Sequence, residues 1–338
     1  SYIIYPVKVL FLTEGSYQIG HGHVTRCLSL YQAFEVFGVN THMLIHGDQT
    51  VQGLLQGVNY ELYPWLEDFR YVREKLKSFN AVVIDSYLAG NDVYENISAS
   101  VPVKLFIDDY CRLSYPAGFV LSGSVYGKEL SYPLKDGVEY LTGPEYVPLR
   151  KAFWKVGKKT IRKRLRKVFV SFGGDDARNM TPKVIKLLRE SYPELELFVV
   201  VGKGFKNKEE IHGLVDERVK VFEGLSGEEM KNLMSLVDLA VSAGGQTTYE
   251  LARVGVPSVL LAIADNQLLN CKGWEKAGFA FYAGWWEDKE LWKKLSEGVE
   301  KLKDYELRLK MSKIGRKLID GKGALRVAKK LIKAVQKA

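Results

Sequence analysis

The chain has 338 residues, of which 46% are hydrophobic and 26% charged; this excludes a disordered protein and predicts about two domains. Its three cysteines, Cys27, Cys111 and Cys271, lie far apart, which excludes a disulfide framework or a CxxC metal knuckle and favours a reducing, cytoplasmic location. The net charge of +9 suits an anionic ligand such as a nucleotide, but no nucleic-acid-binding motif accompanies it.

The first half of the chain alternates short apolar runs with longer helical patterns. Strands are expected at 7–12, 41–46, 81–85 and 103–108, and helices from about Val24 to Phe37 and over 67–79. We interpret the apolar stretch within 1–15 as a first strand and not as a signal peptide, and no apolar run is long enough to span a membrane. This alternation predicts a parallel sheet with helices on both faces.

The same rhythm restarts at Val168. Further strands are expected at 168–172, 197–202, 219–225, 239–245 and 257–263, with a helix beginning at Thr181. The fold class is therefore α/β, with two Rossmann-like, doubly wound domains over 1–154 and 167–338 that face each other across a cleft. A basic amphipathic pattern over 324–337 predicts a last helix, which either stays with the second domain or packs back on the first.

A strongly basic segment joins the two halves. Eight of the thirteen residues in 155–167 are Lys or Arg, and we place the linker at 155–166. The first interpretation is a solvated linker or exposed helix. The alternative is peripheral contact with an anionic membrane surface, or attraction to a polyphosphate.

The first candidate site follows the first strand, in the sequence Gln18 to Arg26. Gly20 and Gly22 permit positive φ angles and close approach of a ligand, and the helix that follows offers free N–H groups to a diphosphate. His23 is the candidate general base, with the neutral imidazole favoured by neighbouring positive charge; the alternative is a capping histidine. His21 and His23 have no acidic or cysteine partner nearby in sequence, so no metal site is predicted.

The second candidate site is the segment 242–250, where a strand ends in two glycines and a helix begins. Exposed backbone amides and the helix N-terminus form a second anion site, with Thr247 or Thr248 as the cap. Glu250 is placed to accept ribose hydroxyls, or else it forms a capping box with Thr247. The UDP-binding residues that we predict are Gly22, Gly174, Gly244, Gly245, Gln246, Thr247, Thr248 and Glu250.

Polar residues follow other strands as well. Asn266 and Gln267 suit recognition of sugar hydroxyls, and Arg26 is assigned with them to the sugar; the alternative for 264–267 is a plain turn. The carboxylates at 85, 108–109 and 175–176 are interpreted as strand-ending turns or helix caps.

Taken together, these segments resemble the UDP-2,4-diacetamido-2,4,6-trideoxy-β-L-altropyranose hydrolases of pseudaminic acid biosynthesis. That family has the GT-B fold and is related to the MurG-type N-acetylglucosaminyltransferases. The matching stretches span nearly the whole chain in order; they are 18–30, 82–87, 105–110, 143–153, 170–179, 242–250, 266–267 and 320–327.

The resemblance assigns roles to individual positions. His23 takes the place of the family's catalytic histidine, Tyr87 that of an active-site tyrosine and Asn266 that of a substrate-binding asparagine. Glu250 resembles the ribose-binding glutamate of the MurG-type fold, and the loop 244–248 resembles its diphosphate cradle.

The resulting expectation is hydrolysis of a UDP-activated, N-acetylated amino sugar without a metal or other cofactor. Water, activated by His23, attacks the anomeric carbon, and UDP leaves toward helix ends and backbone amides. The alternatives are a glycosyltransferase that uses an acceptor hydroxyl, a binding protein without turnover, and an epimerase that releases no net UDP. The expected partner is a UDP-sugar, with no nucleic acid.

Overall fold

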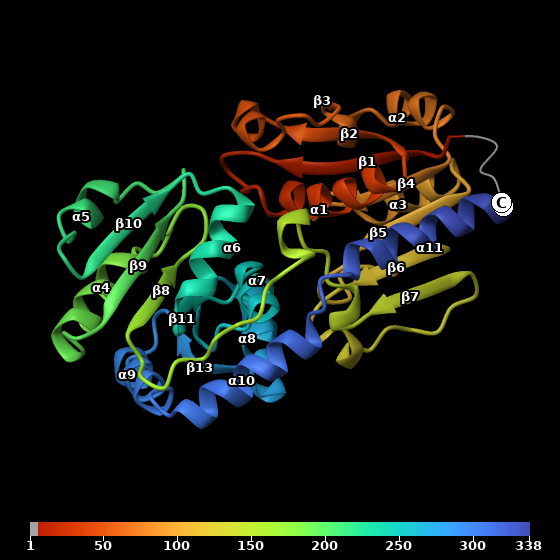
Figure 1. Ribbon diagram of the computed structural model, residues 1–338. Coiled ribbons are helices and arrows are strands. Elements are labelled where there is room, and N and C mark those ends of the chain that lie inside the picture. The colour runs from red at the N-terminus through yellow and green to blue at the C-terminus, as the bar shows by residue number, and fades with distance from the viewer. Residues whose placement is uncertain (1–5) are drawn as a thin grey trace. The chain divides into compact units, whose positions relative to one another are not determined.

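The computed structural model describes residues 6–338, and the part of the first-strand prediction that falls on residues 1–5 lies outside them. The chain forms two compact units (Figure 1). The first comprises the described part of Ser1–Lys151 together with Gly321–Ala338, and the second comprises Ala152–Asp320. The chain thus leaves the first unit and returns to it with its last helix.

The first unit is built on a seven-stranded sheet in the order β3-β2-β1-β4-β5-β6-β7, in which every strand pair is parallel. The order reverses direction between β1 and β4. The strands are β1 (Lys8–Gly15), β2 (Asn40–Gly47), β3 (Tyr60–Leu62), β4 (Ala81–Asp85), β5 (Val103–Ile107), β6 (Gly118–Ser122) and β7 (Val138–Thr142). The helices are α1 (Gly22–Val36), α2 (Phe69–Leu76), α3 (Asn91–Ser98) and α11 (Gly323–Lys337).

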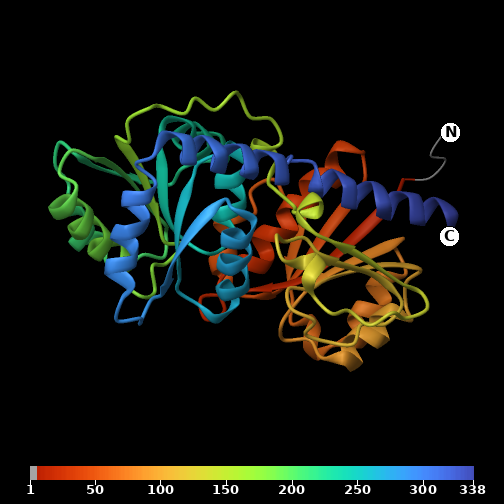
Figure 2. The same ribbon diagram turned by 90° about the horizontal axis from the view of Figure 1, so that it is seen from below.

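Helices cover both faces of this sheet. In α1, Val24, Cys27, Tyr31 and Phe34 recur at helical spacing and are buried, and Phe34 meets Phe11 of β1 edge to face at 5.9 Å. Helix α11 packs against α1 and β5 on that side (Figure 2). Residues of α2 and α3 bury their apolar side chains with alternate residues of the strands, on the opposite face.

The second unit has a six-stranded parallel sheet in the order β10-β9-β8-β11-β12-β13, which reverses between β8 and β11. Its strands are β8 (Lys167–Ser171), β9 (Glu196–Val201), β10 (Val219–Glu223), β11 (Leu239–Ala243), β12 (Ser258–Ala262) and β13 (Ala280–Trp285). Its helices are α4 (Met180–Ser191), α5 (Lys208–His212), α6 (Gly227–Leu236), α7 (Thr247–Val254), α8 (Leu268–Ala277), α9 (Leu291–Lys301) and α10 (Tyr305–Leu318).

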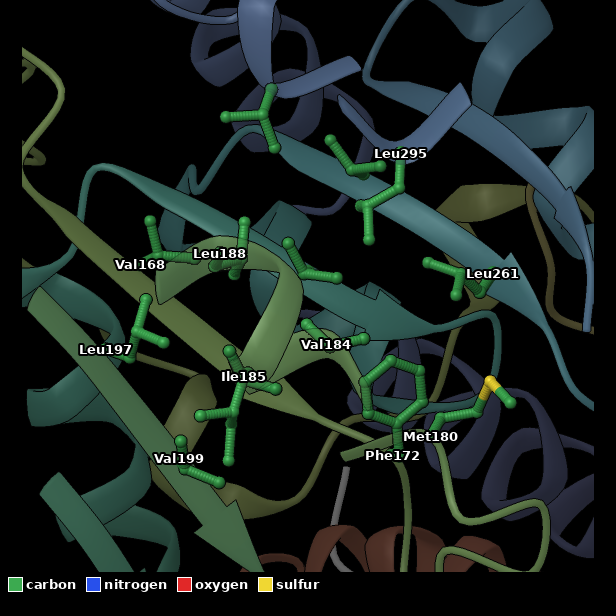
Figure 3. Close-up of a cluster of buried hydrophobic side chains, with 14 of the residues drawn as sticks. Val168, Phe172, Met180, Val184, Ile185, Leu188, Leu197, Val199, Leu261 and Leu295 are labelled. Carbon is green, nitrogen blue, oxygen red and sulfur yellow. The ribbon is translucent and has the colours of Figure 1, made fainter. Parts of the chain in front are cut away.

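The core of the second unit lies between this sheet and helices α4 and α9 (Figure 3). Val168 of β8 and Leu197 of β9 pack against Val184 and Leu188 of α4, while Leu295 belongs to α9. The central strands β8, β9, β11 and β12 are buried along most of their length because helices cover both faces. This core fixes the carboxyl ends of β8, β11 and β12, where polar loops follow.

The α/β class and the two parallel sheets agree with the sequence prediction. The expected helix over 67–79 is shorter, since Asp68 accepts a hydrogen bond from the Tyr71 amide and caps α2 at its start. Four strands, β3, β6, β7 and β13, were not predicted. β3 has only three residues, and β6, β7 and β13 contain glycine or exposed polar positions that weaken the apolar pattern.

The basic segment 155–167 belongs to the second unit and forms no helix. Lys159 donates to the carbonyls of Ser235 and Val237 at 3.0 and 2.6 Å, at the C-terminal end of α6. Arg162 forms a bidentate pair with Asp238 at 2.8 and 3.1 Å. Two of the basic side chains therefore hold the segment on the unit. Lys167 is partly buried at the start of β8, and the other five, at 155, 158, 163, 164 and 166, are exposed. None of the helices described over 6–338 is long and apolar enough to cross a membrane.

Candidate functional site

A polar cluster lies at the carboxyl ends of β1 and β4, where the strand order of the first sheet reverses. Ligands of open parallel sheets bind at such points, because the loops that leave two neighbouring strands separate there. His23 follows β1 in the first turn of α1, and Asp85 is the last residue of β4. The topology thus brings together two residues that are 62 positions apart.

The Nδ1 atom of His23 lies 2.6 Å from Oδ1 of Asp85. Only 1% of the Asp85 side chain and 14% of the His23 side chain is exposed. A carboxylate in contact with Nδ1 keeps the proton on that nitrogen, which leaves the lone pair on Nε2. His23 is therefore oriented as a base that accepts a proton at Nε2.

Arg26, one turn further along α1, is held between two carboxylates. Its Nε and Nη2 donate to Asp85 at 2.7 and 2.8 Å, and its Nη1 and Nη2 donate to Asp109 at 2.5 and 3.2 Å. Four of its five N–H groups are used in this way. The assignment of Arg26 to the sugar is corrected accordingly, because its charge is engaged by the protein and it orients Asp85.

Tyr87 also joins the cluster. Its hydroxyl donates to Asp109, and its ring meets the His23 ring edge to face at 4.4 Å. Burial, together with the Asp109 carboxylate, raises the pKa of Tyr87 far above the usual range, so its hydroxyl remains protonated. Tyr87 is therefore a hydrogen-bond donor and a wall for the His23 ring.

The protonation of His23 differs from the sequence prediction. Burial lowers the pKa of His23, but the charge and hydrogen bond of Asp85 outweigh burial and Arg26, so the net pKa is raised. Burial acts to raise the pKa of Asp85, but Arg26 and His23 hold it at about 2. Arg26 does favour the neutral imidazole, as expected, but the net prediction is wrong because it left out the carboxylates of Asp85 and Glu14, which raise the pKa of His23.

Three acidic residues of the cluster were missed or misassigned from sequence. Asp85 and Asp109 were interpreted as turn residues, and Glu14 was not considered. Glu14 is the penultimate residue of β1, is 1% exposed, and its Oε2 lies 4.0 Å from Nε2 of His23. The available signal was their common position at the ends of β1, β4 and β5, which a parallel sheet brings to one edge.

A hollow of about 370 Å³ lies at the same edge of the first sheet. It is lined by residues after β1, β2, β3 and β4, and its apolar wall consists of Ile19, Leu62, Tyr63, Pro64 and Leu88. Ile19 and Leu88 are 43% and 54% exposed, although they are large apolar side chains. Exposed apolar side chains gathered at a hollow are typical of a binding surface. Leu88 directly follows Tyr87, so the hollow adjoins the polar cluster.

The remaining residues of the first loop have distinct places. Gly20 has the positive φ that was expected, at 80°, whereas Gly22 is the first residue of α1 and needs no special angle. A Cβ on Gly22 would meet no atom, so a ligand can approach there. His21 is the N-cap residue, and its Nε2 lies 2.8 Å from the hydroxyl of Thr50.

Within residues 6–338, no group of three or more His, Cys, Asp or Glu side chains is arranged to hold a metal ion.

The loop after β11 in the second unit is braced from α8. Thr248 is fully buried; its hydroxyl donates to the Gly245 carbonyl at 2.7 Å and accepts from Asn270 and Trp274 at 3.0 and 2.9 Å. The Gly244 amide points to the carbonyl of Leu261 at 3.1 Å. Thr248 and the Gly244 amide thus shape this loop and are not free to bind a ligand, in contrast to the sequence prediction.

The start of α7 excludes the proposed capping box. The N-cap residue is Gln246, without a side-chain cap, so neither Thr247 nor Thr248 caps the helix. Glu250 is the fourth helical residue, one position beyond that of a capping-box acid. Glu250 is 8% exposed.

The other predicted residues of the second unit follow β8 and β12, on either side of β11. A Cβ on Gly174 would meet no atom within 4 Å, and the Gly174 carbonyl accepts from the Gly204 amide at 2.9 Å. Asn266 is exposed, whereas Oε1 of Gln267 accepts from the amides of Ile263 and Gly244 at 3.0 and 3.2 Å. Gln267 therefore holds the loops after β11 and β12 together, and only its NH₂ group is left for a sugar.

Comparison with known proteins finds a glycosyltransferase domain family and several biosynthetic proteins that are similar to this chain. Residues 168–330 match the glycosyltransferase family 28 C-terminal domain. Over 337 residues the chain is 26% identical to the spore coat polysaccharide biosynthesis protein SpsG of Bacillus subtilis, covering 95% of this chain and 96% of that protein.

A second relative is the pseudaminic acid cytidylyltransferase and UDP-2,4-diacetamido-2,4,6-trideoxy-β-L-altropyranose hydrolase of Helicobacter pylori. It is 24% identical over 279 residues, covering 81% of this chain and 47% of that protein. The resemblance to these hydrolases is confirmed. The chain spans about half the length of two of the curated relatives it matches, 55% and 47%.

Among solved structures, MurG of Acinetobacter baumannii has a TM-score of 0.68 at 18% identity, covering 97% of this chain and 100% of that chain. At this identity the likeness shows the fold. The protein has the GT-B fold.

Proposed function

We propose that the protein hydrolyses a UDP-activated, N-acetylated amino sugar and releases UDP and the free sugar, in the biosynthesis of a nonulosonic acid or a surface polysaccharide. The first unit supplies the base and the second unit binds UDP. The observation that carries the proposal is the 2.6 Å contact between His23 and Asp85 at the switch point of the first sheet, which leaves Nε2 ready to accept a proton. The relatives named as hydrolases support the choice of reaction.

In the proposed reaction, the oxygen of a water molecule forms a bond to the anomeric carbon while one of its protons passes to Nε2 of His23. The bond between the anomeric carbon and the diphosphate oxygen breaks, and its electron pair leaves with UDP. The resulting imidazolium is stabilised by Asp85, the role that a buried carboxylate plays beside a catalytic histidine. A positioned base of this kind contributes about 10²–10⁴-fold to the rate. No metal ion is required.

For UDP, the proposal uses the glycine loops after β8 and β11 and the N-terminus of α7. The backbone around Gly174 and Gly245 and the residues Gln246 and Thr247 contact the diphosphate, and Glu250 accepts the ribose hydroxyls. Asn266 contacts the sugar. The apolar hollow beside Tyr87 takes the methyl groups of the N-acetyl or deoxy substituents, which suits its lining.

A second candidate is a glycosyltransferase with the same nucleotide site, in which an acceptor hydroxyl replaces water. The match of 168–330 to a glycosyltransferase domain and the MurG-like fold favour it.

Under either function, the exposed basic side chains of 155–167 are proposed to contact an anionic membrane surface. Co-sedimentation with vesicles that contain anionic lipid, compared with neutral vesicles, tests that contact.

The deciding experiment incubates the protein with a panel of UDP-sugars, with and without acceptor alcohols, and follows UDP and free sugar by chromatography. Release of UDP and free sugar in equal amounts without an acceptor is the result expected of a hydrolase. Release that depends on the acceptor would replace it by the transferase, and binding of UDP-sugars without any release would refute both.

A further inference from the structure

Glu14 is a second buried carboxylate beside His23, and it lies within strand β1. Its Oε2 accepts from the amides of Tyr87 and Leu88 at 2.9 and 3.2 Å, and its Oε1 accepts from the Ser86 hydroxyl. The carboxylate therefore lies against the turn that follows β4. The same Oε2 atom lies 4.0 Å from Nε2 of His23, on the side away from Asp85.

These contacts leave two proton acceptors opposite each other. Because the proton of His23 is held on Nδ1 by Asp85, Nε2 presents a lone pair. Glu14 presents the charged Oε2, which accepts from the amides of Tyr87 and Leu88 and whose negative charge attracts a further donor. A separation of 4.0 Å is too long for a direct hydrogen bond. An oxygen atom at about 2.8 Å from each of the two would make an angle of about 90° between them, which is near the angle between the two protons of water.

We propose that Glu14 and His23 together hold the attacking water through both of its protons, so that Glu14 is the residue that selects water over an acceptor hydroxyl. This inference rests on the proposed hydrolysis. One proton of the water is donated to Nε2 of His23 and is transferred as the oxygen bonds to the anomeric carbon. The other stays on the oxygen, directed at Glu14, and becomes part of the new anomeric hydroxyl, while the electron pair of the broken bond leaves with UDP.

An alcohol cannot satisfy the same pair of acceptors. It has one hydroxyl proton, so binding it at this point leaves either Glu14 or His23 opposite an oxygen lone pair. If the proton is given to Glu14, His23 cannot act as the base. If it is given to His23, the oxygen faces a carboxylate without a proton between them, which is unfavourable in a buried site. The geometry therefore disfavours transfer to hydroxyl acceptors.

The variant Glu14→Gln tests the role of Glu14 in holding water separately from the support that Glu14 gives to the turn after β4. The amide oxygen of Gln can take the place of Oε2 and accept from the amides of Tyr87 and Leu88, while its NH₂ group donates to the Ser86 hydroxyl. The negative charge is lost and the shape is kept. Ser86→Ala is the matched control, because it removes two hydrogen bonds of the turn, to Glu14 and from the Ala89 amide, but leaves the Glu14 carboxylate in place.

The experiment measures hydrolysis of the best UDP-sugar from the panel in water containing methanol, with free sugar and methyl glycoside quantified separately. For the native protein we expect free sugar alone. For Glu14→Gln we expect kcat to fall about five- to tenfold, the difference between a charged and a neutral hydrogen bond, with little change in KM. Methyl glycoside should become detectable, and the acid limb of the pH profile should move to lower pH, because the Glu14 charge raises the pKa of His23.

Several results would overturn the inference. The first is formation of methyl glycoside by the native protein in proportion to the methanol present. The second is a Glu14→Gln variant that keeps the native kcat and forms no methyl glycoside. The third is a Ser86→Ala variant whose kcat and methyl glycoside yield change as much as those of Glu14→Gln. Where the variant is unstable, the measurement on the native protein can still overturn the inference. Failure of the proposed function gives a different result, namely no UDP release from any UDP-sugar by the native protein.

Discussion

Asp85→Asn is the change that most directly tests the organisation of the site. In the native protein Oδ1 of Asp85 contacts Nδ1 of His23 at 2.6 Å and accepts from Nη2 of Arg26, while Oδ2 accepts from Nε of Arg26. Asparagine has only one acceptor oxygen. If its NH₂ group takes the place of Oδ1, it favours the His23 tautomer with the proton on Nε2, and the base is lost. If it takes the place of Oδ2, it opposes an N–H of Arg26.

The expected magnitudes follow from these contacts. Loss of the correct tautomer removes the contribution of the base, so kcat should fall about 10²–10⁴-fold. The pKa of Asp85 lies at about 2 against 3.8 for the free side chain, a difference of 1.8, so ionised Asp85 stabilises the fold by about 2 kcal/mol at neutral pH. Because this pKa is depressed, the stabilisation is present above about pH 4 and is lost as the pH falls toward 2.

The assay combines UDP release with thermal unfolding, and Asp108→Asn is the control. Asp108 is also buried and follows the neighbouring strand, but it accepts from the amides of Cys111 and Arg112 and from two tyrosines, with no contact to His23. Both variants should be destabilised, Asp85→Asn with a Tm lower by about 5–8 °C, but only Asp85→Asn should lose turnover. A near-native kcat in Asp85→Asn, or an equal loss of kcat in the two variants, would refute the role of Asp85 in orienting His23 as the base.

Four further outcomes are expected. His23→Asn should lower turnover about 10²–10⁴-fold and leave UDP affinity within a few-fold by calorimetry; a near-native rate would make His23 structural. Glu250→Ala should weaken UDP binding by about 1.5–3 kcal/mol, and unchanged affinity would argue against the ribose contact. Activity should persist in EDTA, so loss on chelation with recovery in Mg²⁺ or Mn²⁺ would contradict the metal-free reaction. The acid limb of kcat/KM should have an apparent pKa above 6.5, since the net effect of burial and the Asp85 charge on His23 is upward; a limb below 6.5 would contradict that balance.

Periodicity and loop composition were sufficient to predict the architecture and the position of His23. Apolar runs such as 81–85 coincide with a buried strand, because a strand covered on both faces has no polar alternation to obscure it. Glycines and polar residues after β1, β8 and β11 marked the loops that leave the sheets. These signals are local, so a single window of sequence contains them.

The partners of His23 could not be predicted in the same way. The contact to Asp85 spans 62 positions and the contact from Arg26 to Asp109 spans 83, so each depends on the strand order of the sheet. A carboxylate after a strand has the same sequence signature whether it caps a turn, as Asp108 does, or orients a histidine, as Asp85 does. Only the reversal of strand order between β1 and β4 distinguishes them, since it places Asp85 directly beside the start of α1.

The charge of the cluster also bears on where UDP can bind. Glu14, Asp85 and Asp109 carry three negative charges and Arg26 one positive charge, which leaves −2 while His23 is neutral and −1 once it is protonated. Such a site favours proton uptake by His23 but repels a diphosphate. This charge argues against the sequence-based prediction that Gly22 contacts UDP. Under the proposed function, the first unit therefore contacts the uncharged sugar and the water molecule, and we propose that the glycine loops and the start of α7 in the second unit provide the positive potential for UDP.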